Sequence, residues 1–182
     1  HTHTYTHITG VAAQQALGSA RVAMVGCDGL HGEVAKNLVL AGVGALAVYD
    51  GCCVEEAHLV PHVLLNGADA ESIVGSRMDA AVAPALAELN PRVDVVVLDQ
   101  AELTADALAK AGTSVVLIGG LLSENPPLPP KDALALADAL HDAGLAVFVS
   151  GGMGMAGFFL ADPGEAFHYL DTKAARNVAD EA

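Results

Sequence analysis

The sequence predicts an α/β fold, with a mostly parallel sheet, helices on both faces and an antiparallel hairpin at its C-terminal end. Three observations lead to this prediction. Residues 21–50 have the pattern of a buried strand, a glycine turn, a helix and a second strand that ends in an acid. Later apolar runs are continuous rather than alternating, which is typical of parallel strands buried on both faces. Near the end, two short aromatic-bearing runs indicate an antiparallel pair.

The expected elements alternate along the chain. We expect strands at 21–26, 45–49, 93–99, 114–120 and 145–150, and helices at 11–20, 29–41, 74–89, 101–112 and 131–144. Glycine or proline marks several helix ends, because Gly18 and Gly112 stop two helices and Pro91 follows a third. The segment 51–72 contains a proline and a glycine and is expected to be irregular. The hairpin is predicted to turn at residues 162–164, Asp-Pro-Gly.

Length and composition indicate one domain with one core. At 182 residues the chain is long enough to bury a sizeable core. We divide it into an N-terminal arm and helix (1–20), the α/β domain (21–170) and a tail (171–182) that has the character of a frayed or truncated end. Hydrophobic residues make up 53% of the chain, but no apolar run approaches the ~20 residues that a membrane helix needs. We therefore expect no membrane partner.

Charge and cysteine content narrow the expected partners and the compartment. The net charge of −14 would repel a phosphate backbone, so we expect no nucleic-acid partner. The three cysteines, Cys27, Cys52 and Cys53, form no disulfide framework, which suits a reducing compartment. The first residues lack the basic region and apolar core of a signal peptide. We therefore expect the cytoplasm or the nucleus.

The glycine turn after the first strand does not complete a dinucleotide fingerprint. That fingerprint, G-x-G-x-x-G, needs one glycine for the turn, one for close approach to the pyrophosphate and one for helix packing. Gly26, Gly29 and Gly32 are instead spaced by three. The residue two after Gly26 is Asp28, whose carboxylate would repel a pyrophosphate by several kcal/mol in an upper-bound Coulomb estimate. Asp50, which ends the second strand, is placed to bond a ribose hydroxyl. These residues predict a Rossmann-like fold with a degraded nucleotide site.

A resemblance to a known family rests on several stretches. They are GCDGLHG at 26–32, EVAKNLVLAGV at 33–43, APALAELNP at 83–91 and GGMGMAGFFLADPG at 151–164. Together they resemble the ThiF-like adenylation domain of the ubiquitin-activating enzyme family, over about residues 8–170. The sequence is most similar to the non-catalytic half, which is the N-terminal repeat of a ubiquitin-activating enzyme or the small subunit of a SUMO- or NEDD8-activating heterodimer.

The family motifs can be placed on this sequence position by position. Active members adenylate the C-terminal carboxylate of a ubiquitin-like protein with ATP and magnesium. The resemblance implies that their glycine turn, G-x-G-G-x-G, keeps Gly26 and Gly29 here and has Asp28 and His31 at the other two positions. The ribose acid matches Asp50. A second acid of the family falls on Cys52. The Asn and the Arg that meet the phosphates fall on Val60 and Pro61. The lysine falls on Met78, and the magnesium-binding Asp falls on Gly120.

These changes imply a catalytically silent chain. Adenylation chemistry needs cationic groups and a metal ion, and the loss of one such group commonly costs ~10²–10³-fold in rate. We therefore expect no catalytic residue, no metal and no cofactor on this chain. The remains of a nucleotide site are Gly26, Asp28, Gly29 and Asp50. The resemblance implies a homologous catalytic subunit or domain as partner, with ATP and Mg in the partner's site, and a ubiquitin-like modifier. Non-catalytic halves extend an N-terminal arginine toward the partner, but the aligned position is near Thr4 and no arginine precedes Arg21.

Other interpretations stay open from the sequence. An active or divergent ATP-binding adenylyltransferase of the same family would show pyrophosphate exchange. An NAD-dependent oxidoreductase would bind NADH tightly, although Asp28 disfavours it. Cys52 and Cys53 are expected to be buried and inert. His58 and His62 have the spacing of a helical zinc pair, but Pro61 interrupts that helix.

Three further stretches have no assigned chemistry. The N-terminal histidines His1, His3 and His7 alternate with other residues and form no closed set of metal ligands. Residues 123–130, SENPPLPP, read as a rigid surface loop rather than a ligand for an aromatic groove. Residues 153–159, MGMAGFF, fit either a dimer interface or ordinary core.

Overall fold

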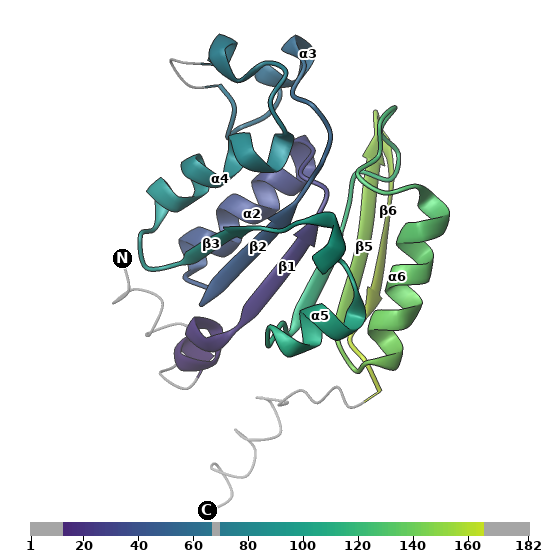
Figure 1. Ribbon diagram of the computed structural model, residues 1–182. Helices are drawn as coiled ribbons and strands as arrows, with labels where there is room; N and C mark the ends of the chain where they lie inside the picture. Colours follow the sequence, from purple (N-terminus) through teal and green to yellow (C-terminus); the bar gives the residue numbers. More distant parts are fainter. Residues whose placement is uncertain (1–12, 67–69, 166–182) are drawn as a thin grey trace, which may run out of the picture.

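The computed structural model describes residues 13–66 and 70–165, and a six-stranded sheet runs through them (Figure 1). The strands are β1 (Arg21–Val25), β2 (Ala45–Tyr49), β3 (Asp94–Val97), β4 (Val115–Ile118), β5 (Ala146–Met153) and β6 (Ala156–Asp162). They lie in the order β3-β2-β1-β4-β5-β6. The first five are parallel, and β6 is antiparallel to β5. The predicted fold class is confirmed.

Helices cover both faces of the sheet, as the sequence predicts. They are α2 (Gly29–Ala41), α3 (Glu56–Leu59), α4 (Met78–Leu89), α5 (Ala105–Lys110) and α6 (Pro130–Asp142), with 3-10 turns at Ala70–Ile73 and Gln100–Glu102. Residues 13–19 are also helical. Helices α2 and α4 share one buried cluster with the strands, and α5 and α6 share another on the opposite face. In the described ranges, no helix combines the length and the apolar character needed to cross a membrane.

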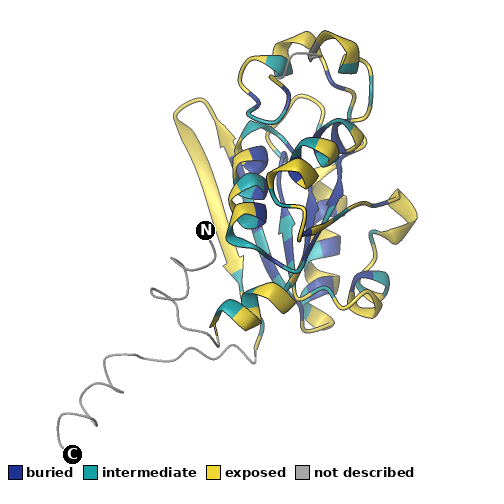
Figure 2. Ribbon diagram, turned by 90° about the vertical axis from the view of Figure 1, so that its left-hand side faces the viewer, coloured by how far each residue is buried: buried dark blue, intermediate teal, exposed yellow. Residues whose placement is uncertain are grey.

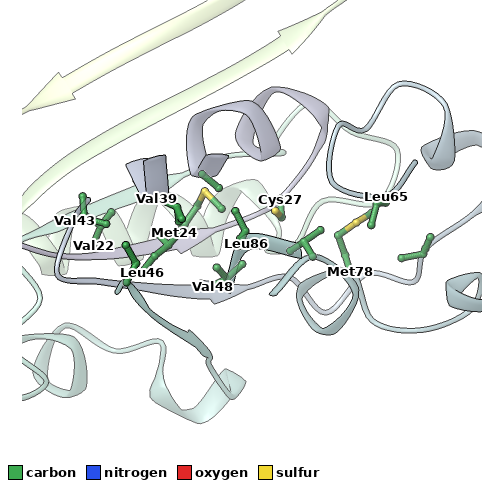
Figure 3. Close-up of a cluster of buried hydrophobic side chains, with 14 residues drawn as sticks. Val22, Met24, Cys27, Val39, Val43, Leu46, Val48, Leu65, Met78 and Leu86 are labelled. Carbon is green, nitrogen blue, oxygen red and sulfur yellow. The ribbon is translucent and has the colours of Figure 1, made fainter. Parts of the chain in front are cut away.

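Alternate residues of β1 divide the core between the two faces of the sheet. Met24 belongs to the cluster under α2 and α4, together with Leu46 and Leu86 (Figure 3). Val25 belongs to the cluster under α5 and α6, together with Ile118. All five side chains are fully buried. Burial on both sides explains why the sequence of β1 is continuously apolar.

The helix of the first βαβ unit has the predicted bounds because local residues cap both of its ends. Helix α2 begins after Asp28, whose side chain accepts a hydrogen bond from the N–H of His31. It ends at Gly42, which has a left-handed φ of 88° and donates its N–H to the carbonyls of Leu38 and Val39. Strand β2 then follows at the predicted residues. This unit positions the loop that carries Asp28.

Helix α4 begins four residues later than predicted. Residue 74 was the expected start, but Gly75 has a left-handed φ of 85° and Arg77 is extended. Arg77 also forms an isolated antiparallel bridge with Cys53, which holds this stretch of backbone out of the helix. The helix therefore begins at Met78.

Other bounds differ in smaller ways. The helix predicted at 101–112 is divided, because Thr104 caps α5 and a 3-10 turn precedes it. The helix at 13–19 continues through Gly18, which was expected to stop it. The segment 51–72 was expected to be irregular but contains α3 and a 3-10 turn. Residues 1–12 and 166–182 lie outside the described residues, and so do the arm with its histidines, the position near Thr4 and the tail.

The C-terminal hairpin is present, but the prediction that it turns at residues 162–164 is wrong. Strand β5 continues to its pairing with the start of β6, and the chain turns at Gly154 and Met155. Gly154 has a φ of 60°, the left-handed value that glycine supplies in a two-residue hairpin turn. Asp162 instead ends β6, and its carboxylate accepts a hydrogen bond from the N–H of Gly164.

Candidate functional site

A cavity of about 580 Å³ lies at the carboxyl ends of the central strands. Strand β1 is flanked by β2 on one side and β4 on the other, and in such sheets ligands bind where the strand order reverses. The loops that follow these three strands line the cavity. They contribute Asp28 and Gly29 after β1, Asp50 after β2 and Gly120 after β4. The structure therefore brings Asp28, Gly29 and Asp50 together, as the sequence analysis expected.

Gly26 makes the turn that leads from β1 into this cleft. It has a left-handed φ of 90°, and its N–H donates to the carbonyl oxygen of Tyr49 at 2.8 Å. A Cβ atom here would lie 2.5 Å from the carbonyl oxygen of Gly119. Both the conformation and the space therefore require glycine at this position.

The carboxylate of Asp28 lies at the N-terminus of α2. Its Oδ1 accepts a hydrogen bond from the backbone N–H of His31 at 2.9 Å and lies 2.7 Å from Nδ1 of the same residue. Burial would raise the pKa of this carboxyl group, but the hydrogen bonds from His31 outweigh burial and hold the pKa below its usual value. Asp28 is therefore an anion in the position where a fingerprint glycine would leave room for a phosphate.

His31 is a buried residue that the sequence analysis placed at a glycine position of the family motif. Its ring Nε2 lies 2.9 Å from the hydroxyl oxygen of Ser150 on β5. A Cβ atom on Gly119 would overlap this ring, so the imidazole fills the space between α2 and the end of β4. The role of Ser150 had no sequence signal, because the two residues are 119 positions apart.

Asp50 lies in the cleft, but its carboxylate is bound to the protein's own backbone. It accepts hydrogen bonds from the N–H of Cys27 at 2.8 Å and from the N–H of Cys52 at 3.0 Å. Burial raises the pKa of Asp50, and these two hydrogen bonds oppose that shift. The carboxylate thus ties the loop after β1 to the loop after β2. A bond to a ribose hydroxyl stays a prediction.

Asp79 is a buried carboxylate that the sequence analysis missed. It accepts hydrogen bonds from the N–H of Asp50 at 2.9 Å and from two guanidinium nitrogens of Arg77 at 3.0 and 2.6 Å. Arg77 also lies over the ring of Tyr49, 5.7 Å from its centroid. An acid in the first turn of the helix at 78–89 is the only signal that could have found it. The positive charge of Arg77 is therefore already paired.

His58 and His62 do not face a common metal position. The Nδ1 atom of His58 accepts a hydrogen bond from the N–H of Glu55. His62 is buried, and its Nε2 donates to the carbonyl oxygen of Cys27 at 2.8 Å. Burial lowers the pKa of His62, which favours the neutral ring. In the part of the chain that the structure describes, no three His, Cys, Asp or Glu residues are grouped as metal ligands.

The cysteines differ in exposure. Cys27 is buried in the core, whereas the expectation that Cys53 is buried is wrong, because it is exposed beside its bridge to Arg77. Cys52 is half-buried, and its thiol donates to the carbonyl oxygen of Asn125 at 3.1 Å. Burial and the nearby Asp50 carboxylate raise the pKa of Cys52 to about 12. The Cys52 thiol is therefore protonated at neutral pH and a weak nucleophile.

The described lining of the cleft lacks the cationic side chains that would meet the phosphates of ATP, the nucleotide that the family resemblance implies for active members. It carries carboxylates and, among the described lining residues, no lysine or arginine; the acids are Asp28, Asp50, Glu55 and Glu124. Val60 is 85% exposed, and Met78 is buried in the core. Gly120 has a φ of 70° and packs against Pro127. The side chains of Val60 and Met78 carry no positive charge for a triphosphate, and Gly120 has no side chain to bind magnesium at the family's metal position.

Comparisons with known proteins identify relatives of this chain. A model described as the ThiF family matches residues 2–160. Human "Ubiquitin-like modifier-activating enzyme 7" is 34% identical over 169 residues, which are 93% of this chain and 15% of that protein. "SUMO-activating enzyme subunit 1" of Dictyostelium discoideum is 35% identical over 109 residues, which are 59% of this chain and 32% of that protein.

Solved structures agree on the fold. E. coli MccB, crystallised with succinimide, has a TM-score of 0.68 to this chain and 16% sequence identity. The match covers 92% of this chain and 49% of that structure. At this identity the likeness concerns the fold alone. The family model, however, covers most of the sequence, and the chain therefore belongs to the ThiF family.

Proposed function

We propose that this chain is a catalytically silent adenylation-type half or subunit of a ubiquitin-like modifier-activating enzyme. It pairs with a homologous active subunit or domain, and that partner binds ATP and magnesium and adenylates the C-terminus of a ubiquitin-like modifier. The similarity to human ubiquitin-like modifier-activating enzyme 7 and to a SUMO-activating enzyme subunit supports this assignment. Because the chain spans 15% and 32% of these relatives, the complete assembly is part of the proposal.

The observation that carries the proposal is the carboxylate of Asp28 at the N-terminus of α2. Backbone N–H groups at this place are the donors that receive phosphate in nucleotide-binding folds. Here the N–H of His31 already donates to Asp28. A phosphate would also meet the negative charge, and two unit charges about 4 Å apart repel by about 4 kcal/mol at an effective dielectric constant of about 20. No described lysine or arginine in the lining offsets this repulsion.

The hairpin β5–β6 offers an apolar surface for the partner. Figure 2 shows β6 as an exposed strand at the edge of the sheet. Met153 and Phe159 are 66% and 69% exposed, and Met155 and Leu160 are also exposed. Phe159 stacks on Phe148 with ring centroids 6.0 Å apart. Aromatic and methionine side chains are enriched at protein–protein interfaces.

An active or divergent adenylyltransferase is the alternative. It is favoured by the cavity of about 580 Å³ and by Asp50 at the position of the family's ribose acid. Both carboxylate oxygens of Asp50 nevertheless accept backbone hydrogen bonds, which ties this acid to structure. The two proposals differ in whether the isolated chain binds ATP.

Calorimetry and isotope exchange separate the two proposals. The silent-subunit proposal expects no heat on titration of the chain with ATP and magnesium, and no ATP–pyrophosphate exchange. Steady exchange by the chain alone would establish the alternative. Inclusion of an active adenylation subunit in a parallel reaction shows that the assay detects turnover.

Purification of the full-length protein from its native cell tests the partner. We expect a homologous adenylation subunit to copurify in a stoichiometric complex, or to be found as a second domain of the same polypeptide. A chain that stays a monodisperse 18.4 kDa species at high concentration, and whose size does not change with the candidate partner, would contradict the proposal.

A further inference from the structure

Three side chains form one hydrogen-bonded group that runs from the edge of the cleft into the protein, and we name it the His31 contact. They are Asp28 in the turn after β1, His31 in the first turn of α2 and Ser150 on β5. Asp28 Oδ1 lies 2.7 Å from His31 Nδ1, and His31 Nε2 lies 2.9 Å from Ser150 Oγ. The group therefore links the start of α2 to strand β5.

The direction of each hydrogen bond follows from the acceptor character of the carboxylate. The pKa of Asp28 is held low, so its side chain is ionised and can only accept. His31 must then carry its proton on Nδ1 to donate to Asp28. In the neutral ring, Nε2 is left as an acceptor, and the hydroxyl of Ser150 donates to it. Both ring nitrogens of the buried His31 are thus hydrogen-bonded within the protein.

The ring also takes up the space that a small residue would leave. His31 is 1% exposed, and a Cβ atom on Gly119 would overlap its imidazole. The third glycine of a nucleotide fingerprint allows helix and strand to pack closely, whereas an imidazole now lies between α2 and β4. The position of the α2 N-terminus, and of the carboxylate of Asp28 upon it, is fixed by this packing.

We propose that the His31 contact is an autoinhibitory contact that supplies the cleft with its own anion. The Asp28 carboxylate accepts from the N–H of His31 at the α2 N-terminus, and the His31 ring, which Ser150 contacts on its other side, holds that carboxylate in place. This inference rests on the proposed function and adds to it a cause within the chain. The cleft excludes phosphate because it is already occupied, in addition to having no cationic side chain in its described lining.

Restoring glycine at both positions tests this inference. We expect Asp28→Gly combined with His31→Gly to bind inorganic pyrophosphate about tenfold or more tightly than the wild-type chain, measured by calorimetry at low salt. Asp99→Gly removes one carboxylate from the exposed start of the 3-10 turn at Gln100–Glu102 and is the matched charge control. It should leave pyrophosphate binding unchanged. A control that gains binding equally would overturn the inference, because net charge would then explain the result.

The outcomes separate this inference from the proposed function. If the wild-type chain and a folded double variant both fail to bind, the autoinhibitory contact is wrong and the silent subunit stands. If the wild-type chain binds ATP, the proposed function fails, and the inference fails with it. Binding by the double variant alone supports both.

A second set of measurements tests the inference if the double variant does not fold. Asp28→Ala removes both the charge and the acceptor that occupies the N–H of His31, and we expect pyrophosphate binding to increase by a few-fold; no increase would overturn the inference. NMR of the full chain should show a His31 Nδ1 proton protected from exchange. Ser150→Ala should reduce that protection without a loss of fold. Protection that is unchanged in Ser150→Ala would contradict the holding role of Ser150.

Discussion

The unit β1–α2–β2 and the hairpin β5–β6 belong to one sheet but have opposite surroundings. In the first, β1 has a strand on each side and helices over both faces, and Met24 and Leu46 are fully buried. In the second, β6 pairs with β5 alone among the described strands, and residues 156–161 are all exposed. We therefore expect substitutions in the unit to affect stability most, and substitutions in the exposed hairpin to affect it least.

The largest expected effect comes from truncating the core of the unit. Leu46→Ala should lower the free energy of unfolding by about 2–5 kcal/mol, because a fully buried side chain is replaced by a cavity. Urea denaturation measures the change. Leu134→Ala on α6 is the control, since its exposed side chain should contribute within about 0.5 kcal/mol. Equal losses in the two variants would show that burial in the unit β1–α2–β2 does not determine the stability of the protein.

The second largest loss of stability is expected from a substitution in the loops that line the cleft. Asp79→Ala removes the acceptor of the buried Asp50 N–H, and an unsatisfied buried group costs about 1–3 kcal/mol. It also removes the ion-pair partner of Arg77, whose side chain is 44% exposed and can be hydrated instead. We expect a loss of about 3 kcal/mol in the free energy of unfolding. Asp106→Ala, at the exposed start of α5, should cost about 0.5 kcal/mol. If Asp79→Ala costs no more than this control, the cleft loops do not share the stability of the unit.

A smaller loss of stability is expected from a substitution at the contact between β4 and the ring of His31. Gly119→Ala should destabilise the protein by about 1–3 kcal/mol, because its methyl group would overlap the ring of His31. Adding His31→Gly removes the ring and should restore much of this loss. A double-mutant cycle by denaturant unfolding measures the coupling. Additive losses would show that the ring of His31 does not fill this space.

The attachment of β6 to α6 should depend on pH. His141 Nδ1 lies 2.7 Å from Asp162 Oδ2, and this hydrogen bond raises the pKa of His141 above its ordinary 6.5. Hydrogen bonds, chiefly from the N–H of Gly164, lower the pKa of Asp162 below its ordinary 3.8. The imidazolium contribution is complete below 6.5 and is lost as pH rises through the folded pKa of His141. The carboxylate contribution is complete above 3.8 and is lost as pH falls through the folded pKa of Asp162.

The pair is therefore strongest between these two ordinary values, and NMR can follow it. We expect the titration midpoint of the His141 ring to fall toward 6.5 in Asp162→Asn. Asp138→Asn, on the same helix, is the control and should leave the midpoint nearly unchanged. An unshifted midpoint in Asp162→Asn would mean that the pair does not form in solution.

The smallest effect on stability is expected in the hairpin itself. Phe159→Asp replaces a 69% exposed ring and should lower the free energy of unfolding by about 1 kcal/mol, because the stack on Phe148 is lost. The same substitution should sharply weaken association with the copurifying partner, measured by analytical ultracentrifugation. Leu134→Asp is a matched exposed position on α6 and should leave association intact. Loss of association in both variants would remove the hairpin's special role.

Much of the fold could be predicted because its signals are local. The N-cap at Asp28 and the left-handed Gly42 lie at the two ends of α2, and both are visible in the sequence. The start of α4 could not be predicted in this way, because the bridge between Cys53 and Arg77 joins residues far apart in the chain. The hairpin turn was misplaced because Asp-Pro-Gly is the stronger local turn signal, although pairing along β5 selects Gly154.

The candidate site shows the same division. Asp28 and Asp50 could be assigned to one cleft because both follow the carboxyl ends of adjacent parallel strands. The partners of their carboxylates could not be predicted. Asp50 accepts a hydrogen bond from the backbone N–H of Cys27, and Asp28 lies within hydrogen-bond distance of the His31 ring. A carboxylate accepts from whichever donors packing brings near it, and spacing along the chain does not reveal those donors.

The βαβ unit at 21–50 and the family resemblance can be recognised from local patterns, because a turn, a cap and an apolar run each act over a few residues. The contact of His31 with Ser150 and the hydrogen bond from the Asp50 N–H to Asp79 follow from the packing of the folded chain. Those contacts depend on the order of the strands and on helix packing across the sheet, where residues up to 119 positions apart share one buried space.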